Sequence, residues 1–338
     1  FLKKGYVVKF IGDNYLHEEP YTSTLQQMGI EVLYGQEYLT GIWDWLVKNG
    51  KDIHVAYLNR PHIATKYVDF IKEHTDIKMI YYGHDLHFMR EFREYELTGD
   101  VKKRQESEYW KSIEFSLFHK VAVSYYPSYV EEEAIHAVDE TIPVKAITAY
   151  VYEEFLQNLN KDFAKREGLL FVGGFAHPPN ADAVLWFAKE VFPKIREQIK
   201  VNFYIVGSKV TDEIKALEQP GNGIIVKGFV SEEELADLYR NCRIVVVPLR
   251  YGAGVKGKVV EAIYNGAPIV TTSVGSEGIP EVEKVLLVKD QPDEFAETVV
   301  ELYKDEKRLE DLAEKTQVYI REHLSIDAAW DVIKEDFE

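Results

Sequence analysis

The chain has 338 residues, of which 46% are hydrophobic and 29% charged, and its formal net charge at pH 7 is −17. This length allows substantial cores and favours about two domains, while the negative charge disfavours nucleic acid as a partner. The sequence contains no apolar run long enough to span a bilayer and its basic start leads into a strand-like stretch rather than a signal peptide, so we expect a cytoplasmic protein.

Six short runs of β-branched and aromatic residues in the first half predict strands. They cover residues 6–11, 31–34, 53–58, 78–82, 120–124 and 144–148. Helical patterns at 65–74 and 104–120 separate some of them. Alternation of strands and helices is typical of a parallel sheet covered on both faces, so the fold class is α/β.

The second half predicts the same architecture without repeating the sequence. Its strands are expected within residues 169–174, 201–207, 223–229, 242–248, 267–272 and 284–288. Helices are expected at 180–199 and 231–241, the latter opened by a capping box from Ser231 to Glu234, and the last part of the chain is helical in its apolar spacing. We expect the boundary between the halves near residues 150–165.

Two minor features have ordinary structural explanations. The single cysteine, Cys242, precedes an apolar run, which indicates a free thiol near a core. The acidic runs at 131–133 and 232–234 fall in the first turns of expected helices, where carboxylates favour the helix dipole.

The stretch GAGVKGKV at 252–259 satisfies the dinucleotide fingerprint through Gly252, Gly254 and Gly257, and nearly satisfies the phosphate-loop pattern. A phosphate loop needs a hydroxyl residue where Val259 stands, and the dinucleotide fingerprint needs an acidic residue after the next strand, where hydroxyls stand instead. What remains is a strand end, glycines that allow close approach, and a helix that opens near Gly257, which together favour an anion.

Three cations flank these glycines in an otherwise acidic chain: Arg250, Lys256 and Lys258. Glu261 follows Lys258 by about one helical turn and therefore lies on the same face. Cations with backbone amides suit a diphosphate, and the carboxylate suits sugar hydroxyls, so the pattern favours a nucleotide sugar. The alternative is a set of solvated surface lysines.

Residues 245–279 resemble the donor-binding segment of the family 4 retaining glycosyltransferases, and the resemblance extends to 169–187, 226–248 and 80–91. It implies the GT-B fold, with two Rossmann-like domains facing a cleft. The expected domains are an acceptor-side domain at 1–155, a donor domain at 156–325, and a C-terminal helix at 326–338 that returns to the first domain. It also implies a hexosyltransferase that uses a UDP or GDP sugar, with retention and without a metal or other cofactor.

The resemblance assigns the donor site residue by residue. Glu261 would bind the ribose hydroxyls, and the loop around Gly228 would run beside the base. Gly173 and Gly174 would lie beside the phosphates. The first glutamate of the family motif falls on Ala253, and the usual Arg and Lys after the first strand of the domain are replaced by GGFAHPP. Arg250, Lys256 and Lys258 with Gly252 and Gly254 are therefore the expected diphosphate site, and Lys256 is also expected to be catalytic.

The acceptor side is expected in the segment 81–96, directly after a predicted strand. His84 matches a histidine that contacts the donor sugar in the family, whereas Asp85, His87 and Arg90 are candidates by proximity. We expect His84 and Asp85 to be catalytic, and His87 and Arg90 to face the acceptor. A metal site, a general base and a helix start capped by Asp85 remain as alternatives.

The expected function is transfer of a sugar from a nucleotide diphosphate sugar to a glycan or lipid-linked acceptor, in cell-surface polysaccharide biosynthesis. A nucleotide-sugar 2-epimerase of similar fold and an inactive nucleotide- or carbohydrate-binding module are the alternatives. The resemblance also implies that the usual first strand is missing, so we expect a longer, multidomain polypeptide. Peripheral association with a membrane is left open.

Overall fold

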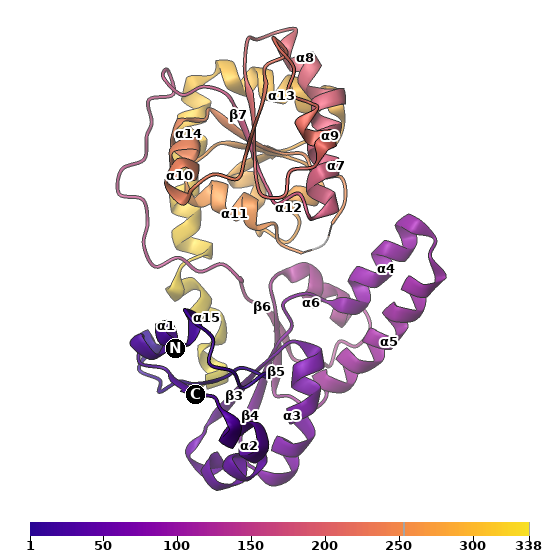
Figure 1. The fold of residues 1–338 in the computed structure, drawn as a ribbon, viewed down its shortest axis with the longest axis vertical. Coiled ribbons are helices and arrows are strands. Elements are labelled where there is room, and N and C mark those ends of the chain that lie inside the picture. Colours follow the sequence, from indigo (N-terminus) through magenta and orange to yellow (C-terminus); the bar gives the residue numbers. More distant parts are fainter. Residues whose placement is uncertain (253, 338) are drawn as a thin grey trace. The chain divides into compact units, whose positions relative to one another are not determined.

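A computed structural model of the chain describes residues 1–252 and 254–337, apart from the side chain of Leu97 (Figure 1). The chain forms two compact units. Unit 1 comprises Phe1–Tyr125 and Val138–Lys145, and unit 2 comprises Tyr126–Ala137 and Ala146–Glu338. The expected bounds at 1–155, 156–325 and 326–338 stay a prediction.

Unit 1 contains a two-stranded sheet and a four-stranded sheet, whose order is β3-β4-β5-β6. The strands are β1 (Lys9–Ile11), β2 (Glu31–Leu33), β3 (Val55–Asn59), β4 (Lys78–Tyr82), β5 (Val123–Tyr126) and β6 (Val144–Ala146). Parallel pairing joins β1 with β2, β3 with β4, and β4 with β5. All six strands lie within or next to the runs expected from the sequence.

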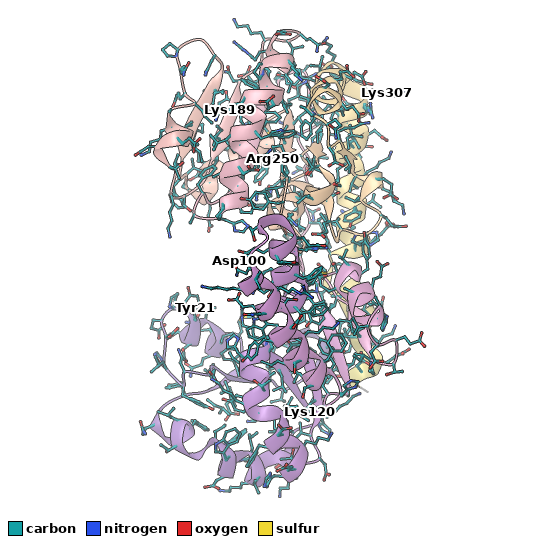
Figure 2. All side chains as sticks on the ribbon, turned by 90° about the vertical axis from the view of Figure 1, so that its right-hand side faces the viewer. Tyr21, Asp100, Lys120, Lys189, Arg250 and Lys307 are labelled. Carbon is teal, nitrogen blue, oxygen red and sulfur yellow. The ribbon has the colours of Figure 1, made fainter. Side chains whose placement is uncertain are left out.

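The helices of this first part of the chain are α1 (Tyr21–Gln27), α2 (Gln36–Asn49), α3 (Pro61–His74), α4 (His87–Thr98), α5 (Val101–Phe118) and α6 (Tyr129–His136), with 3₁₀ turns at Leu2–Lys4 and Gly50–Asp52. The helices α4 and α5 form a hairpin with Asp100 at its tip (Figures 1 and 2). None of the described helices is both long and apolar enough to cross a membrane.

Unit 2 is built on one six-stranded sheet of order β12-β11-β10-β7-β8-β9, in which every neighbouring pair is parallel. Its strands are β7 (Leu169–Val172), β8 (Phe203–Val206), β9 (Ile224–Gly228), β10 (Ile244–Val247), β11 (Ile269–Thr271) and β12 (Leu286–Val288). The central strands β7 and β10 are almost wholly buried. Burial on both faces explains why these strands are continuous apolar runs, and it confirms the α/β fold class.

Helices cover both faces of the unit 2 sheet. The helices of this second part of the chain are α7 (Pro178–Trp186), α8 (Phe192–Arg196), α9 (Asp212–Lys215), α10 (Glu232–Asn241), α11 (Gly257–Tyr264), α12 (Ser273–Ser276), α13 (Pro292–Lys304), α14 (Glu306–His323) and α15 (Ile326–Phe337). Figure 1 shows α7, α8, α9 and α13 on one face, and α10, α11 and α14 on the other. A 3₁₀ turn at Val282–Lys284 precedes β12.

The helix expected over 180–199 is interrupted. It consists of α7, a π-helical turn at Phe187–Val191, and α8. Pro193 stands at the start of α8, where its ring lacks an amide hydrogen and crowds the preceding turn. Proline at this position is the physical reason for the break.

Several local predictions are confirmed. The Ser231 hydroxyl accepts a hydrogen bond from the Glu234 amide at the start of α10. Both acidic runs lie in first turns, those of α6 and α10. Cys242 is buried with a free thiol, and burial raises the pKa of that thiol to about 11.

Candidate functional site

The strand order of unit 2 marks one position on the sheet. From β7 the chain winds outward through β8 and β9, and from its neighbour β10 it winds the other way through β11 and β12. The crossovers therefore diverge at the carboxyl ends of β7 and β10, which is where open α/β sheets bind ligands. Gly173 and Gly174 follow β7, and the glycine-rich loop with Lys256 follows β10.

The turn after β7 is closed by its own hydrogen bonds. The Asn180 side-chain amide donates to the Gly174 carbonyl over 2.8 Å, and the Asn180 backbone amide donates to the His177 carbonyl over 3.0 Å. His177 is the residue that precedes α7. The turn thus presents His177 and Asn180 at the carboxyl edge of the sheet.

Lys258, in the first turn of α11, lies across this turn. Its Nζ donates to Asn180 Oδ1 over 2.6 Å and stands 5.5 Å from the centre of the Phe171 ring. A β-carbon at Gly173 would come within 3.2 Å of Lys258 Cε, so Gly173 leaves room for the lysine. Burial lowers the pKa of Lys258 to about 8, and the neighbouring Lys256 ammonium adds to this effect.

Lys256 lies at the end of the glycine-rich loop with only 10% of its side chain exposed. Its Nζ donates to the Gly254 carbonyl and stands 3.4 Å from Glu277 Oε2. Gly252 and Gly254 have φ angles of 137° and 72°, which side chains rarely adopt. Gly252 and Gly254 therefore allow the loop to fold back, so that the Gly254 carbonyl reaches Lys256 Nζ. Ala253, where the first glutamate of the family motif falls, lies outside the described residues.

Arg250 is paired with an acidic side chain on α7. Its guanidinium forms a forked pair with the carboxylate of Asp182 on α7, with Nε 2.8 Å from Oδ2, and lies beside that helix (Figure 2). Its partner already neutralises it, so the cations that the structure brings together at the loop are Lys256 and Lys258.

A cavity of about 450 Å³ opens along α11. Its lining residues are Tyr150, Tyr152, Gly257, Glu261, Tyr264 and Asn265. The rings of Tyr152 and Tyr264 stack with their centres 4.1 Å apart and an interplanar angle of 11°. The cavity thus combines an aromatic wall, a carboxylate and the first residue of a helix.

Glu261 is half-buried in this wall. Burial raises the pKa of its carboxyl, and the nearby Tyr239 hydroxyl opposes that shift only in part. A partly dehydrated carboxylate gains from hydroxyl donors, so the site suits a ligand that brings vicinal hydroxyls.

Gly228 ends β9 with a φ of 70°, and its carbonyl accepts from the Gly207 amide over 2.8 Å. It lies at the same carboxyl edge as Gly173 and Gly174, two strands away from β7. Its positive φ explains the glycine by turn geometry alone.

Gly257 begins α11 directly against a tyrosine. A β-carbon there would come within 2.7 Å of the Tyr150 hydroxyl and 3.2 Å of the Tyr150 ring. We expect Gly257→Ala to displace Tyr150 and to destabilise the protein by about 1–3 kcal/mol, because the added carbon overlaps the Tyr150 hydroxyl and forces that side chain to move. Chemical denaturation measures this, and Gly257→Ala combined with Tyr150→Ala should recover part of the loss. Equal stability of Gly257→Ala and the unchanged protein would contradict the packing described.

In unit 1, the sheet edge carries His84 after β4 and Asn59 at the end of β3. His84 Nε2 lies 3.2 Å from Asn59 Oδ1, and its ring meets the Tyr82 ring edge-on. His84 and Arg60 both have positive φ angles, 42° and 60°, which are uncommon for residues other than glycine. Burial and the Arg60 guanidinium lower the pKa of His84, against the opposing effect of Asp85.

The remaining candidates of this segment have partners within unit 1. The Asp85 carboxylate pairs with the Arg90 guanidinium, which also binds Glu91 over 2.8 Å. The N-cap of α4 is Leu86, so the alternative of Asp85 as the cap is wrong.

His87 is buried, with its Nδ1 3.1 Å from the carboxylate of Glu114. Its ring therefore packs inside unit 1 instead of presenting both nitrogens to a ligand. Within residues 1–252 and 254–337, no three histidine, cysteine or acidic side chains are placed to hold one metal ion. The orientation of His84 and Asp85 toward the glycines of unit 2 stays a prediction.

Sequence reasoning missed five residues at these two edges: Asn59, Arg60, Tyr150, His177 and Asn180. Asn59 and Arg60 directly follow the run that predicts β3, and His177 and Asn180 lie in the loop after β7. Polar residues at the carboxyl ends of predicted parallel strands were a usable signal for these four. Tyr150 follows no such signal.

Residues 166–305 match the family model described as Glycosyl transferases group 1. This range contains the loop after β7, the glycine-rich loop and Glu261. The chain is also 29% identical over 183 residues to an "uncharacterized 44.6 kDa protein in cps region" of Klebsiella pneumoniae. This match covers 52% of this chain and 45% of that protein. The chain thus spans less than half the length of the curated relative it matches.

Solved structures match over nearly the whole chain. Sucrose-phosphate synthase from Thermosynechococcus elongatus superposes with a TM-score of 0.67 at 15% identity, covering 99% of this chain and 89% of that one. Alr3699/HepE from Anabaena, in complex with UDP, superposes with a TM-score of 0.67 at 13% identity, covering 98% of this chain and 99% of that one. TarM from S. aureus superposes with a TM-score of 0.66 at 14% identity, covering 88% of this chain and 57% of that one. The fold is that of the GT-B glycosyltransferases. The expected fold class is confirmed.

Proposed function

We propose that the chain is a glycosyltransferase that moves a sugar from a nucleoside diphosphate sugar to a glycan or lipid-linked acceptor. The observation that carries this proposal is the grouping of Lys256, Lys258, the start of α11 and the Glu261 cavity at one point. That point is where the crossovers of the unit 2 sheet diverge, inside the range that matches the Glycosyl transferases group 1 model.

Each part of the grouping has a role in the proposed reaction. The two ammonium groups and the α11 amides attract the diphosphate, because positive charge and free backbone donors add at a helix start. Glu261 accepts hydrogen bonds from ribose hydroxyls, and the aromatic wall excludes water around them. As the bond from the sugar to the diphosphate breaks, the lysines stabilise the charge on the departing phosphate.

Retention follows from the family resemblance in this proposal. The acceptor oxygen bonds to the sugar carbon on the face that the diphosphate leaves, and its proton passes to the departing phosphate oxygen. This route requires neither a nucleophilic carboxylate nor a metal ion. His84 and Asp85 orient the sugar and acceptor, with the Asp85 carboxylate held by Arg90.

The proposed substrate class rests on the ligands bound in similar solved structures and on the location of a relative. HepE was solved with UDP-glucose, and the pneumococcal O-GlcNAc transferase GtfA with UDP and GlcNAc, which favours a UDP sugar here. The relative encoded in a cps region favours cell-surface polysaccharide as the pathway. We place the reaction in the cytoplasm, with peripheral membrane contact where the acceptor is lipid-linked.

The deciding experiment incubates the protein with a panel of UDP and GDP sugars, with and without glycan acceptors. Release of nucleoside diphosphate that increases with acceptor, together with an extended glycan, supports the proposal. Interconversion of donor epimers without transfer would instead identify a 2-epimerase, and binding without turnover would identify a binding module. Neither result is compatible with the proposed transferase.

Glu261→Ala tests the ribose contact. The change is expected to weaken uridine, UMP and UDP by a similar factor, about 5- to 30-fold, because the lost hydrogen bonds involve the part common to all three ligands. Calorimetry with the three ligands measures this. Glu297, an acidic residue on α13, provides the control substitution Glu297→Ala. A loss confined to UDP would place Glu261 at the phosphates and contradict the assignment.

A further inference from the structure

His177 belongs to a group of nitrogens that come from two segments far apart in the sequence. It precedes α7 in the turn after β7, and its amide donates to the Gly174 carbonyl over 3.3 Å. Asn180, in the same turn, ties this segment to Lys258 through the 2.6 Å hydrogen bond. The imidazole of His177 is exposed, and its backbone carbonyl accepts from the amide of Asn180, the residue that holds Lys258.

The charges around His177 are of one sign. Desolvation lowers the pKa of His177, and the ammonium groups of Lys258 and Lys256 lower it further. The carboxylate placed near the two lysines is Glu277, 3.4 Å from Lys256. The loop after β8 also contacts this turn, because the Ser208 carbonyl accepts a hydrogen bond from the Phe175 amide. The next residue of that loop is another cation, Lys209.

We propose that His177 is the third cation of the diphosphate site, and that the site takes up protons when a nucleotide sugar binds. This inference rests on the proposed function. Two phosphate charges beside His177 and Lys258 favour the protonated form of both side chains, since an opposite charge at close range stabilises a cation. In the empty site the Lys258 and Lys256 ammonium groups disfavour the protonated form of His177, and the negative charge of the ligand offsets this effect.

The direction of the pH dependence follows from linkage. Because the bound pKa of each group lies above its free pKa, binding is strongest below both values and weakens as pH rises through them. For Lys258, with a free pKa of about 8, the weakening begins near pH 8 and continues above it. For His177, whose free pKa is below its ordinary value, it falls in the acidic to neutral range.

Calorimetry with UDP-glucose in pairs of buffers of small and large ionisation enthalpy measures the protons taken up. This probe is suitable because its diphosphate is a diester, so its two charges do not titrate in this range. At pH 8 we expect an uptake of about half a proton, from Lys258, and at pH 6.5 a separate uptake from His177.

Two variants separate the contributions. His177→Gln should abolish the uptake at pH 6.5 and weaken binding about 5-fold at pH 6, with less than about 2-fold change at pH 9. Lys258→Arg keeps the charge but cannot titrate, so it should still bind while the uptake at pH 8 disappears. The matched control is His62→Gln, an exposed histidine on α3 of unit 1, which should leave both uptakes unchanged.

Equal binding enthalpies in both buffers, with UDP-glucose bound, would overturn this inference while leaving the proposed function standing. Failure of the whole nucleotide-sugar panel to bind at any pH would overturn both. An uptake at pH 6.5 that persists in His177→Gln would assign the proton to another group and overturn the role of His177. Imidazole resonances followed by NMR provide a second readout, in which His177 should titrate at higher pH with ligand than without.

Discussion

Lys258→Met is expected to weaken the binding of UDP sugars about 10- to 100-fold. The lysine lies in the first turn of α11, with its Nζ bonded to Asn180 and its side chain partly buried near the Phe171 ring. A charge-assisted contact to phosphate contributes about 1.5–3 kcal/mol, which corresponds to this range of affinity. Uridine lacks phosphates, so its binding should change little.

The same substitution should leave the free protein as stable as before or more stable at neutral pH. The folded state holds Lys258 at a pKa of about 8, below the ordinary value of an unfolded lysine. Unfolding therefore takes up a proton between these two values, and the folded state gains stability as pH rises through that window. Methionine removes this charge from a partly buried place, so loss of binding with intact stability is the expected signature.

Lys189→Met is the matched control, because Lys189 lies on the same unit with 60% of its side chain exposed (Figure 2). Calorimetry gives the affinities, and thermal unfolding without ligand gives the stabilities. Unchanged affinity for UDP sugars in Lys258→Met would contradict the diphosphate assignment. A drop in unfolding temperature much larger than that of Lys189→Met would show that Lys258 is a structural residue.

Glu114→Ala is expected to reduce the free energy of unfolding by about 3–5 kcal/mol. Glu114 on α5 is wholly buried, and its carboxylate accepts from the backbone amides of His87 and Phe88 over 2.9 and 3.1 Å. It therefore caps α4, whose own N-cap residue, Leu86, has no side-chain acceptor. Alanine leaves these amides and the His87 ring without their partner, and stranding buried polar groups carries a cost of this size.

The loss should also reach the candidate acceptor side, because α4 carries Arg90, which holds Asp85. Glu114→Gln keeps the shape and one acceptor oxygen, so its loss should be smaller. Glu108→Ala, on the same helix with 73% of its side chain exposed, is the control and should change stability by less than about 0.5 kcal/mol. Denaturant titration provides the values, and a change below about 1 kcal/mol in Glu114→Ala would contradict the capping role.

Local sequence patterns predicted the strands of both units. The runs at β7 and β10 are apolar throughout because helices cover both faces of their sheet. Consecutive side chains are therefore buried, and the sequence shows this as an unbroken apolar run. The end of α11 also has a local cause, since Gly266 has a φ of 66° and Pro268 stands two residues further on. In each case the cause acts within a few residues.

The expected donor loop lies within the range that matches the family model, but the resemblance could not assign partners to the charges. Arg250 stands beside the glycines in the sequence, yet Asp182, 68 positions away, neutralises it. His87 was expected to face the acceptor, yet it is buried against Glu114, 27 positions away in the sequence.

The sequence by itself determined the α/β class, the strand series and the glycine-rich loop with its two lysines. Only the tertiary structure decided that Lys258 shares a site with Asn180, 78 positions earlier, and with His177. Secondary structure depends on the propensity and burial of neighbouring residues, which a linear pattern records. Whether a charged side chain is paired depends on which side chain, distant in the sequence, folding brings within hydrogen-bond reach of it. No local pattern records the distance between those two side chains.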